Sequence, residues 1–273
     1  MPESKEIAAY RKTMEKAFAF HQEGDFAQAE QVYREILDKD PNDYNALKFL
    51  GILKRQLRQL DEAEKTFRHA LKNFPDELNL LYELGLTLKD MASKKPNAIL
   101  EAIACFQKAY EQNPKFHRAT MQLAMMLNGN SMGDKAETLL MDSIQLSPDN
   151  SELFNLLGYI QQRLNKTEES KVNLLKAIEL DPKNSTAYYN LAYGEKFTQE
   201  PDFAGTIHEL IQSETNVENK YKLHYALGKI YDDLKVYDKA IENFKAANQL
   251  KRKTFQYDIE IEKQNLAVMK QAF

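Results

Sequence analysis

The chain has 273 residues, among them nine glycines and eight prolines, 37 basic and 41 acidic residues, and a formal net charge of −4. So few glycines and prolines leave little material for β-hairpin turns or Gly-rich nucleotide-binding loops, which favours an all-α fold. The slight acidic excess lacks the positive charge that phosphate backbones attract, so we expect no nucleic-acid partner.

Five of the prolines mark a sequence period, because Pro41, Pro75, Pro114, Pro148 and Pro182 lie 34, 39, 34 and 34 residues apart. A proline stops a helix, since its ring cannot continue the hydrogen-bond ladder. A small residue recurs with nearly the same period at Ala17, Gly51, Gly85, Ala124, Gly158, Ala192 and Gly228. A repeat of this length predicts an array of similar supersecondary units.

We predict one helical hairpin for each period, and each is expected to stack on its neighbours. The expected hairpins lie at about residues 10–43, 44–77, 78–116, 117–150, 151–184, 185–220 and 221–252 of a repeat domain spanning 1–252, followed by a C-terminal capping or linker helix at 253–273. The third hairpin is five residues longer than most, and Pro96 indicates that the extra residues form a loop around Met91 to Asn97.

A second small residue follows the first by 12 positions, as in Ala29 and Ala63, and a large residue follows it four positions later, as in Tyr33 and Phe67. We expect the first small residue to be a notch through which each hairpin leans on the next. Asp61, Asp134 and Asp238 precede apolar-periodic runs, so they are predicted to cap the second helices.

This pattern of small and large residues resembles the tetratricopeptide repeat (TPR), a 34-residue helix-turn-helix, over roughly residues 10–252. The resemblance implies an all-α solenoid, coiled as a right-handed superhelix of about seven repeats. It also implies a concave groove that binds a protein or peptide, with no catalytic residue, metal or cofactor in this chain. Stacking is required, because one hairpin cannot bury its own apolar face.

Several segments near the end of the chain have a finer resemblance. Residues 195–198, 223–229 and 246–252 resemble the end of the repeat region in bacterial proteins that fuse TPRs to a sulfotransferase domain. In that family a Pro-Arg-Ser-Gly-Thr-like loop binds 3′-phosphoadenylyl sulfate, and no such loop occurs before Phe273. The resemblance implies the non-catalytic recognition module of a sulfotransferase-family protein.

Two alternatives remain open. In one, the chain is part of a sulfotransferase and contributes to its active unit. In the other, the chain is a self-assembly module that forms a homodimer through the C-terminal helix, whose apolar residues include Phe255, Ile259, Leu266 and Met269.

The TPR resemblance also implies which residues line the groove, since the groove positions lie on the first helix of each hairpin. These are Lys48, Arg55, Tyr82, Lys89, Met121, Met125, Asn128, Asn155, Tyr159, Tyr189, Tyr193, Lys196, Tyr225 and Lys229. Tyrosine and methionine supply contact area at binding hot spots. The competing interpretation is that these side chains only fill the narrow inside of the superhelix.

The remaining candidate chemistry is explained by structural roles. The glycine cluster at residues 129–135 lacks the spacing of a phosphate-binding loop and falls in a predicted turn. No two of the five histidines, His21, His69, His117, His208 and His224, have the i, i+3 or i+4 spacing of metal ligands on a helix. Cys105 precedes Phe106 on a packing stripe, which predicts a buried, inert thiol.

The sequence also bears on location. No run of 18 apolar residues occurs, so we expect no membrane partner. A single cysteine cannot form an internal disulfide, which fits a reducing, cytoplasmic compartment.

Overall fold

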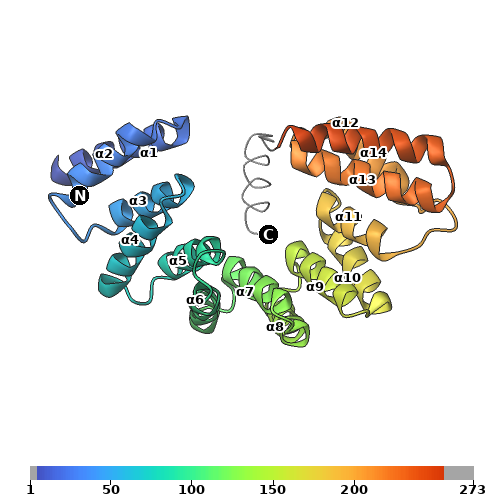
Figure 1. Cartoon of the computed structure of the whole chain (residues 1–273), viewed down its shortest axis with the longest axis horizontal. Helices are drawn as coiled ribbons and strands as arrows, with labels where there is room; N and C mark the ends of the chain where they lie inside the picture. Colours follow the sequence, from blue (N-terminus) through green and yellow to red (C-terminus); the bar gives the residue numbers. More distant parts are fainter. Residues whose placement is uncertain (1–4, 255–273) are drawn as a thin grey trace, which may run out of the picture. The chain divides into compact units, whose positions relative to one another are not determined.

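A computed structural model describes residues 5–254, which contain fourteen α-helices and no strand (Figure 1). The prediction of an all-α fold is confirmed. Phe255, Ile259, Leu266 and Met269, with nearly all of the predicted helix at 253–273, lie outside the described residues. None of the described helices combines the length and apolarity needed to cross a bilayer.

The helices follow one another as seven hairpins, and we call the odd-numbered helices A helices and the even-numbered ones B helices. Their bounds are α1 (Lys5–Glu23), α2 (Phe26–Leu37), α3 (Tyr44–Gln56), α4 (Leu60–Asn73), α5 (Leu78–Met91), α6 (Ala98–Gln112), α7 (His117–Gly129), α8 (Gly133–Leu146), α9 (Ser151–Arg163), α10 (Thr167–Leu180), α11 (Ser185–Gly194), α12 (Ala204–Ser213), α13 (Val217–Asp233) and α14 (Tyr237–Arg252). The expected long loop of the third hairpin is present, since residues 92–97 connect α5 to α6.

The chain forms two compact units, Met1–Leu139 and Leu140–Phe273, and the boundary between them in the sequence falls within α8. In the first unit one buried cluster gathers around Tyr33 and Leu53 and another around Phe67 and Phe106. In the second unit a cluster gathers α11 to α14. Each cluster joins several helices, as expected where a hairpin cannot bury its apolar face alone.

Where the small residue of an A helix is glycine, it is a notch, but the notch is filled from within its own hairpin. A Cβ at Gly51 would lie 2.6 Å from Cε1 of Phe67, and one at Gly85 would lie 2.7 Å from Cε1 of Phe106. Gly158 in α9 is equally close to Leu174 in α10. The expectation that the notch joins one hairpin to the next is therefore wrong, because the large residue that occupies it comes from the following B helix of the same repeat.

In five of the seven hairpins, the turn between the A and B helices contains one residue with positive φ. These residues are Gly24, Arg58, Ser131, Asn165 and Lys235. In the second hairpin Gln59 N–H donates to Lys54 O at 2.9 Å and Arg58 N–H to Arg55 O at 3.0 Å. This pair of bonds is the Schellman motif, which satisfies carbonyls at the end of a helix.

The predicted caps of the B helices are wrong by about two residues. Helix α4 begins at Leu60 with Gln59 as its N-cap, so Asp61 lies in the first turn. Asp134 and Asp238 also lie in the first turns of their helices. The reason is that the Schellman turn leads almost directly into the B helix. The carboxylates still oppose the positive end of the helix dipole.

Successive hairpins are joined by polar contacts that recur with the repeat. Tyr10 Oη donates to Asp43 Oδ1 at 3.1 Å, and Tyr44, one repeat later, donates to Glu77 Oε1 at 3.0 Å. Asp43 also accepts a hydrogen bond from Ala46 N–H at 2.7 Å as the N-cap of α3. The same carboxylate therefore begins an A helix and holds it against the preceding one.

Candidate functional site

In the first unit, two of the cationic residues predicted for the groove make contacts between A helices, and the third makes its contact within α3. Arg55 of α3 lies 3.0 Å from Glu83 of α5, and Lys89 of α5 donates to Gln122 Oε1 of α7 at 2.9 Å. Lys48 is half-buried, and its ammonium lies 4.6 Å from the ring centroid of Phe49. Three of the predicted residues are thus partly engaged within the unit.

Tyr82 differs from its prediction as an open groove residue, because it is only 7% exposed. Its ring lies 5.8 Å from both Phe106 and Phe116, and the guanidinium of Arg118 lies 4.4 Å from its centroid. These neighbours from α6 to α7 cover both the edge and the face of the ring. Tyr82 is therefore a core residue with a cation above it.

Helix α7 contributes the other predicted residues of the first unit. Met125 is 46% exposed, whereas Met121 and Asn128 are half-buried. A flexible, exposed methionine can adapt to varied apolar contacts, and Met125 is the large apolar side chain of α7 that is most exposed.

The second unit brings tyrosines from three A helices together, and we call Tyr159, Tyr189, Tyr193, Tyr221 and Tyr225 the tyrosine cluster. The ring centroids of Tyr189 and Tyr193 on α11 lie 4.6 Å apart. Tyr225 of α13 lies 6.3 Å from Tyr189 and 6.0 Å from Tyr221 in edge-on geometry. Tyr159 of α9 is close enough to Tyr189 to influence its ionisation. These are favourable geometries for aromatic pairs.

The tyrosine cluster is partly desolvated yet accessible. Tyr193 is 46% exposed, while burial, followed by the neighbouring phenols Tyr189 and Tyr225, raises its pKa to about 12. Burial and the surrounding phenols also raise the pKa of Tyr189. Tyr189 and Tyr193 are therefore neutral at physiological pH and present rings and hydroxyl groups.

Sequence reasoning missed Tyr221, which stands one turn before Tyr225 on α13. The four-residue spacing of this pair repeats that of Tyr189 and Tyr193, and such a spacing places two rings on one helix face. That spacing was the available indication of the wider cluster.

The polar residues around the tyrosine cluster are largely satisfied within the unit. Asn190 Nδ2 donates to Asn155 Oδ1 at 2.9 Å, and Lys229 forms an ion pair with Asp233. Tyr225 Oη donates to Asn248 Oδ1 at 2.7 Å. Lys196 is exposed, so it is the predicted cation here that remains most accessible.

The histidines and the cysteine occupy structural environments. His21 contacts Gln56 Oε1 at 2.7 Å, and His208 contacts Tyr231 Oη at 2.9 Å. Burial raises the pKa of Cys105 to about 11, so its thiol is a poor nucleophile near neutral pH. Across residues 5–254 no three His, Cys, Asp or Glu side chains gather as metal ligands.

Helical hairpins that are locked by a small residue opposite a large one, and that share recurrent polar contacts, define an α-solenoid repeat protein. Comparison with known families identifies the repeat. Two profiles described as tetratricopeptide repeat match residues 20–84 and residues 151–184 and 221–254. The chain therefore contains tetratricopeptide repeats.

Solved structures share the fold at low sequence identity. A TPR protein from Parabacteroides merdae matches with a TM-score of 0.62 and 17% identity, over 94% of this chain and 97% of the other. YrrB, described as a TPR protein with an unusual peptide-binding site, matches with a TM-score of 0.50 and 18% identity, over 80% of this chain and 100% of the other.

A similar curated relative is much longer than this chain. Anaphase-promoting complex subunit 3 of Schizosaccharomyces pombe is 24% identical over 166 residues, which are 61% of this chain. The match spans only 25% of that subunit. The similarity to this subunit therefore concerns a part of its length only.

Proposed function

We propose that this chain is a non-catalytic TPR scaffold that binds an extended peptide or a protein segment over the tyrosine cluster. The observation that carries the proposal is the meeting of five tyrosines from α9, α11 and α13, with Tyr193 46% exposed. Tyrosine rings supply contact area at little cost in rotamer entropy, and tyrosine is enriched at binding hot spots. The peptide-binding site named for the similar protein YrrB supports the same role.

The other residues predicted for the groove differ in how accessible they are to a partner. In the second unit, Asn155 joins α9 to α11 through Asn190. Lys229 pairs with Asp233 within α13 and donates to Glu195 O at 3.3 Å, while Lys196 stays accessible to an acidic group of the partner. In the first unit, Met125 offers apolar surface. Lys48, Arg55, Lys89, Met121 and Asn128 lie on α3, α5 and α7 of the first unit, and we assign them to contacts that this unit makes with a partner by itself.

The test starts from a peptide selected for binding to the full chain from a random display library. Replacing Tyr189 and Tyr193 together by alanine should raise the Kd of that peptide about tenfold or more, because two hot-spot rings are lost. The control is Tyr237→Ala, which removes a tyrosine that is 57% exposed at the start of α14, outside the cluster. Unchanged affinity in the double variant, with the helical melt preserved, would contradict the proposal.

The association with a sulfotransferase is the finer part of the proposal and rests on the sequence segments at 195–198, 223–229 and 246–252. In this reading the chain recognises the protein that a bacterial, cytoplasmic sulfotransferase domain modifies. Titration with 3′-phosphoadenosine 5′-phosphate separates it from the enzymatic alternative. Binding of that nucleotide at micromolar Kd would show that the chain contributes to a sulfotransferase active unit.

The self-assembly alternative is tested by measuring the molar mass of the chain in solution. If residues 253–273 drive dimerisation, light scattering should give a molar mass that doubles with concentration, and removal of those residues should abolish the change. A monomer at all concentrations would leave the peptide-binding scaffold as the favoured function.

A further inference from the structure

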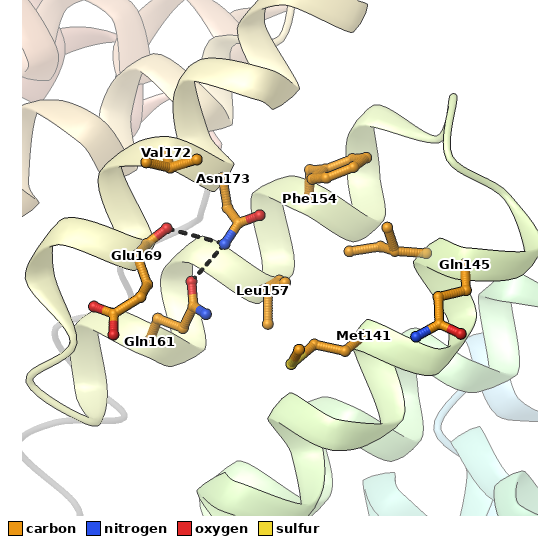
Figure 2. A pocket seen from close by; sticks show the side chains of 9 residues that line it. Met141, Gln145, Phe154, Leu157, Gln161, Glu169, Val172 and Asn173 are labelled. Carbon is orange, nitrogen blue, oxygen red and sulfur yellow. Dashed lines mark hydrogen bonds between the residues drawn. The ribbon is translucent and has the colours of Figure 1, made fainter.

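A cavity of about 460 Å³ opens within the second unit, away from the tyrosine cluster. Helix α8 forms one side, and α9 and α10 form the other (Figure 2). Its apolar lining includes Met141, Phe154, Leu157 and Val172. Met141 is 49% exposed and Val172 is 67% exposed, so water reaches apolar surface that a well-packed repeat junction would cover.

In the first two repeat junctions, ion pairs join the B helices. Arg34 of α2 lies 4.0 Å from Glu62 of α4, and Arg68 of α4 pairs with Glu101 of α6. Lys54 of α3 adds a second cation 3.0 Å from Glu62. A carboxylate near the start of one B helix thus meets an arginine from the B helix before it.

The cavity has this carboxylate but lacks both cations. By the repeat register, Met141 takes the position of Arg34 and Arg68, and Gln161 takes the position of Lys54. Glu169 takes the position of Glu62 and Glu101. Within residues 5–254, no cation pairs with the exposed Glu169 carboxylate. Glu169 is a lining residue of the cavity, and its side chain lies beyond Gln161 and Asn173 as seen from Met141 (Figure 2).

The next junction along the chain, between α10 and α12, has neither the cation nor the carboxylate. There Leu175 stands at the arginine position and Phe203 at the carboxylate position, so an apolar pair replaces the ion pair. The junction at the cavity keeps a charge on one side and apolar surface on the other. This combination matches a ligand with an apolar stem and a cationic end.

We propose that the cavity binds an arginine side chain of a partner protein, flanked in the partner by apolar residues. The guanidinium pairs with Glu169, as Arg34 and Arg68 pair with their carboxylates, and the aliphatic stem lies on Met141 and Val172. Asn173 Nδ2 donates to Gln161 Oε1 at 2.7 Å and to Glu169 O at 2.9 Å, which fixes the polar wall (Figure 2). Arginine suits such a site because its guanidinium is weakly hydrated and its stem packs on apolar surface.

The probe for this proposal is the peptide acetyl-Leu-Arg-Leu-amide, titrated into the full chain labelled with ¹³C at the methionine methyl groups. We expect the Met141 methyl resonance to shift with saturation. The citrulline version of the peptide keeps the shape of arginine without its charge and should bind about threefold more weakly or worse. Glu169→Gln should weaken the arginine peptide by the same factor and leave the citrulline peptide unaffected.

A second variant supplies the missing cation from within the chain. Met141→Arg should pair with Glu169 and occupy the cavity, so that the peptide no longer binds. The matched control is Leu175→Arg, which places the same residue at the corresponding position of the next hairpin, outside the cavity, and should leave binding intact.

Three results would overturn the proposal. The first is a Met141 resonance that does not respond to the arginine peptide, and the second is equal binding of the citrulline peptide, which would assign the cavity to apolar groups alone. The third is a dimer of the wild-type chain that Met141→Arg converts to a monomer, which would make a second copy the occupant. None of these results affects the tyrosine cluster, so the proposed function is tested separately.

Discussion

Replacing Gly85 by alanine tests whether the notch inside each hairpin fixes the distance between its helices. A Cβ at Gly85 would lie 2.7 Å from both Cε1 and Cζ of Phe106, whose side chain is 0% exposed. Alanine gains about 1 kcal/mol over glycine within a helix, whereas an added methyl in a packed core costs about 1–3 kcal/mol. Because the ring has no free space to move into, we expect the upper end of that cost and a net loss of about 1–2 kcal/mol.

The assay is urea unfolding of the full chain followed by far-ultraviolet circular dichroism. The matched control is Gly129→Ala at the end of α7, where nothing lies within 4 Å of the added Cβ. That variant should be unchanged or more stable by up to about 1 kcal/mol. If Gly85→Ala proves as stable as Gly129→Ala, the helices are not held apart by the Phe106 ring and the reasoning fails.

Three further predictions concern buried groups. Burial raises the pKa of Tyr33 from 10.0 to about 12, so Tyr33 ionises first in the unfolded chain and the stability of the fold should fall as the pH rises from about 10 towards 12. Thermal melting over this pH range should show a smaller loss of stability for Tyr33→Phe than for the wild type. Lys54 is 4% exposed and lies 2.8 Å from Glu30, so Lys54→Met, which leaves the Glu30 carboxylate without this partner, should cost about 1–3 kcal/mol in urea unfolding. Burial alone would raise the pKa of Glu30, but hydrogen bonds from Lys54 and Arg34 lower it, so the Lys54 contribution should disappear as acid protonates Glu30. Cys105 should react with Ellman's reagent more than about tenfold more slowly in the folded chain than in urea, and equal rates would contradict its burial.

The repeats could be predicted because their contacts are local in sequence. Gly51 and Phe67 are 16 residues apart and touch within one hairpin, so a fixed spacing of small and large residues is enough to specify the unit. The position of the long loop after Met91 followed from the same register. Prolines at the ends of B helices completed the pattern.

The parts that depend on a neighbouring repeat could not be predicted in this way. Tyr82 is covered by Phe116 and Arg118, which belong to the following hairpin. The Schellman turns use positive φ at Arg58 and Lys235, residue types that give no indication of it, unlike glycine or asparagine. The unpaired carboxylate at the cavity becomes visible only when corresponding positions of successive B helices are compared.

The internal filling of the notch makes each hairpin a transferable part. Since Phe67 fits the Gly51 backbone without help from another repeat, that fit travels with the hairpin when it is moved along the array. At a new position in the array, only the polar contacts between neighbouring hairpins have to be matched, such as the hydrogen bond from Tyr44 to Glu77. The stability of chimaeras built from these repeats should therefore depend on whether the polar residues of adjacent hairpins are compatible. Duplication of a hairpin, followed by substitution of these residues, is an accessible route to arrays of other lengths.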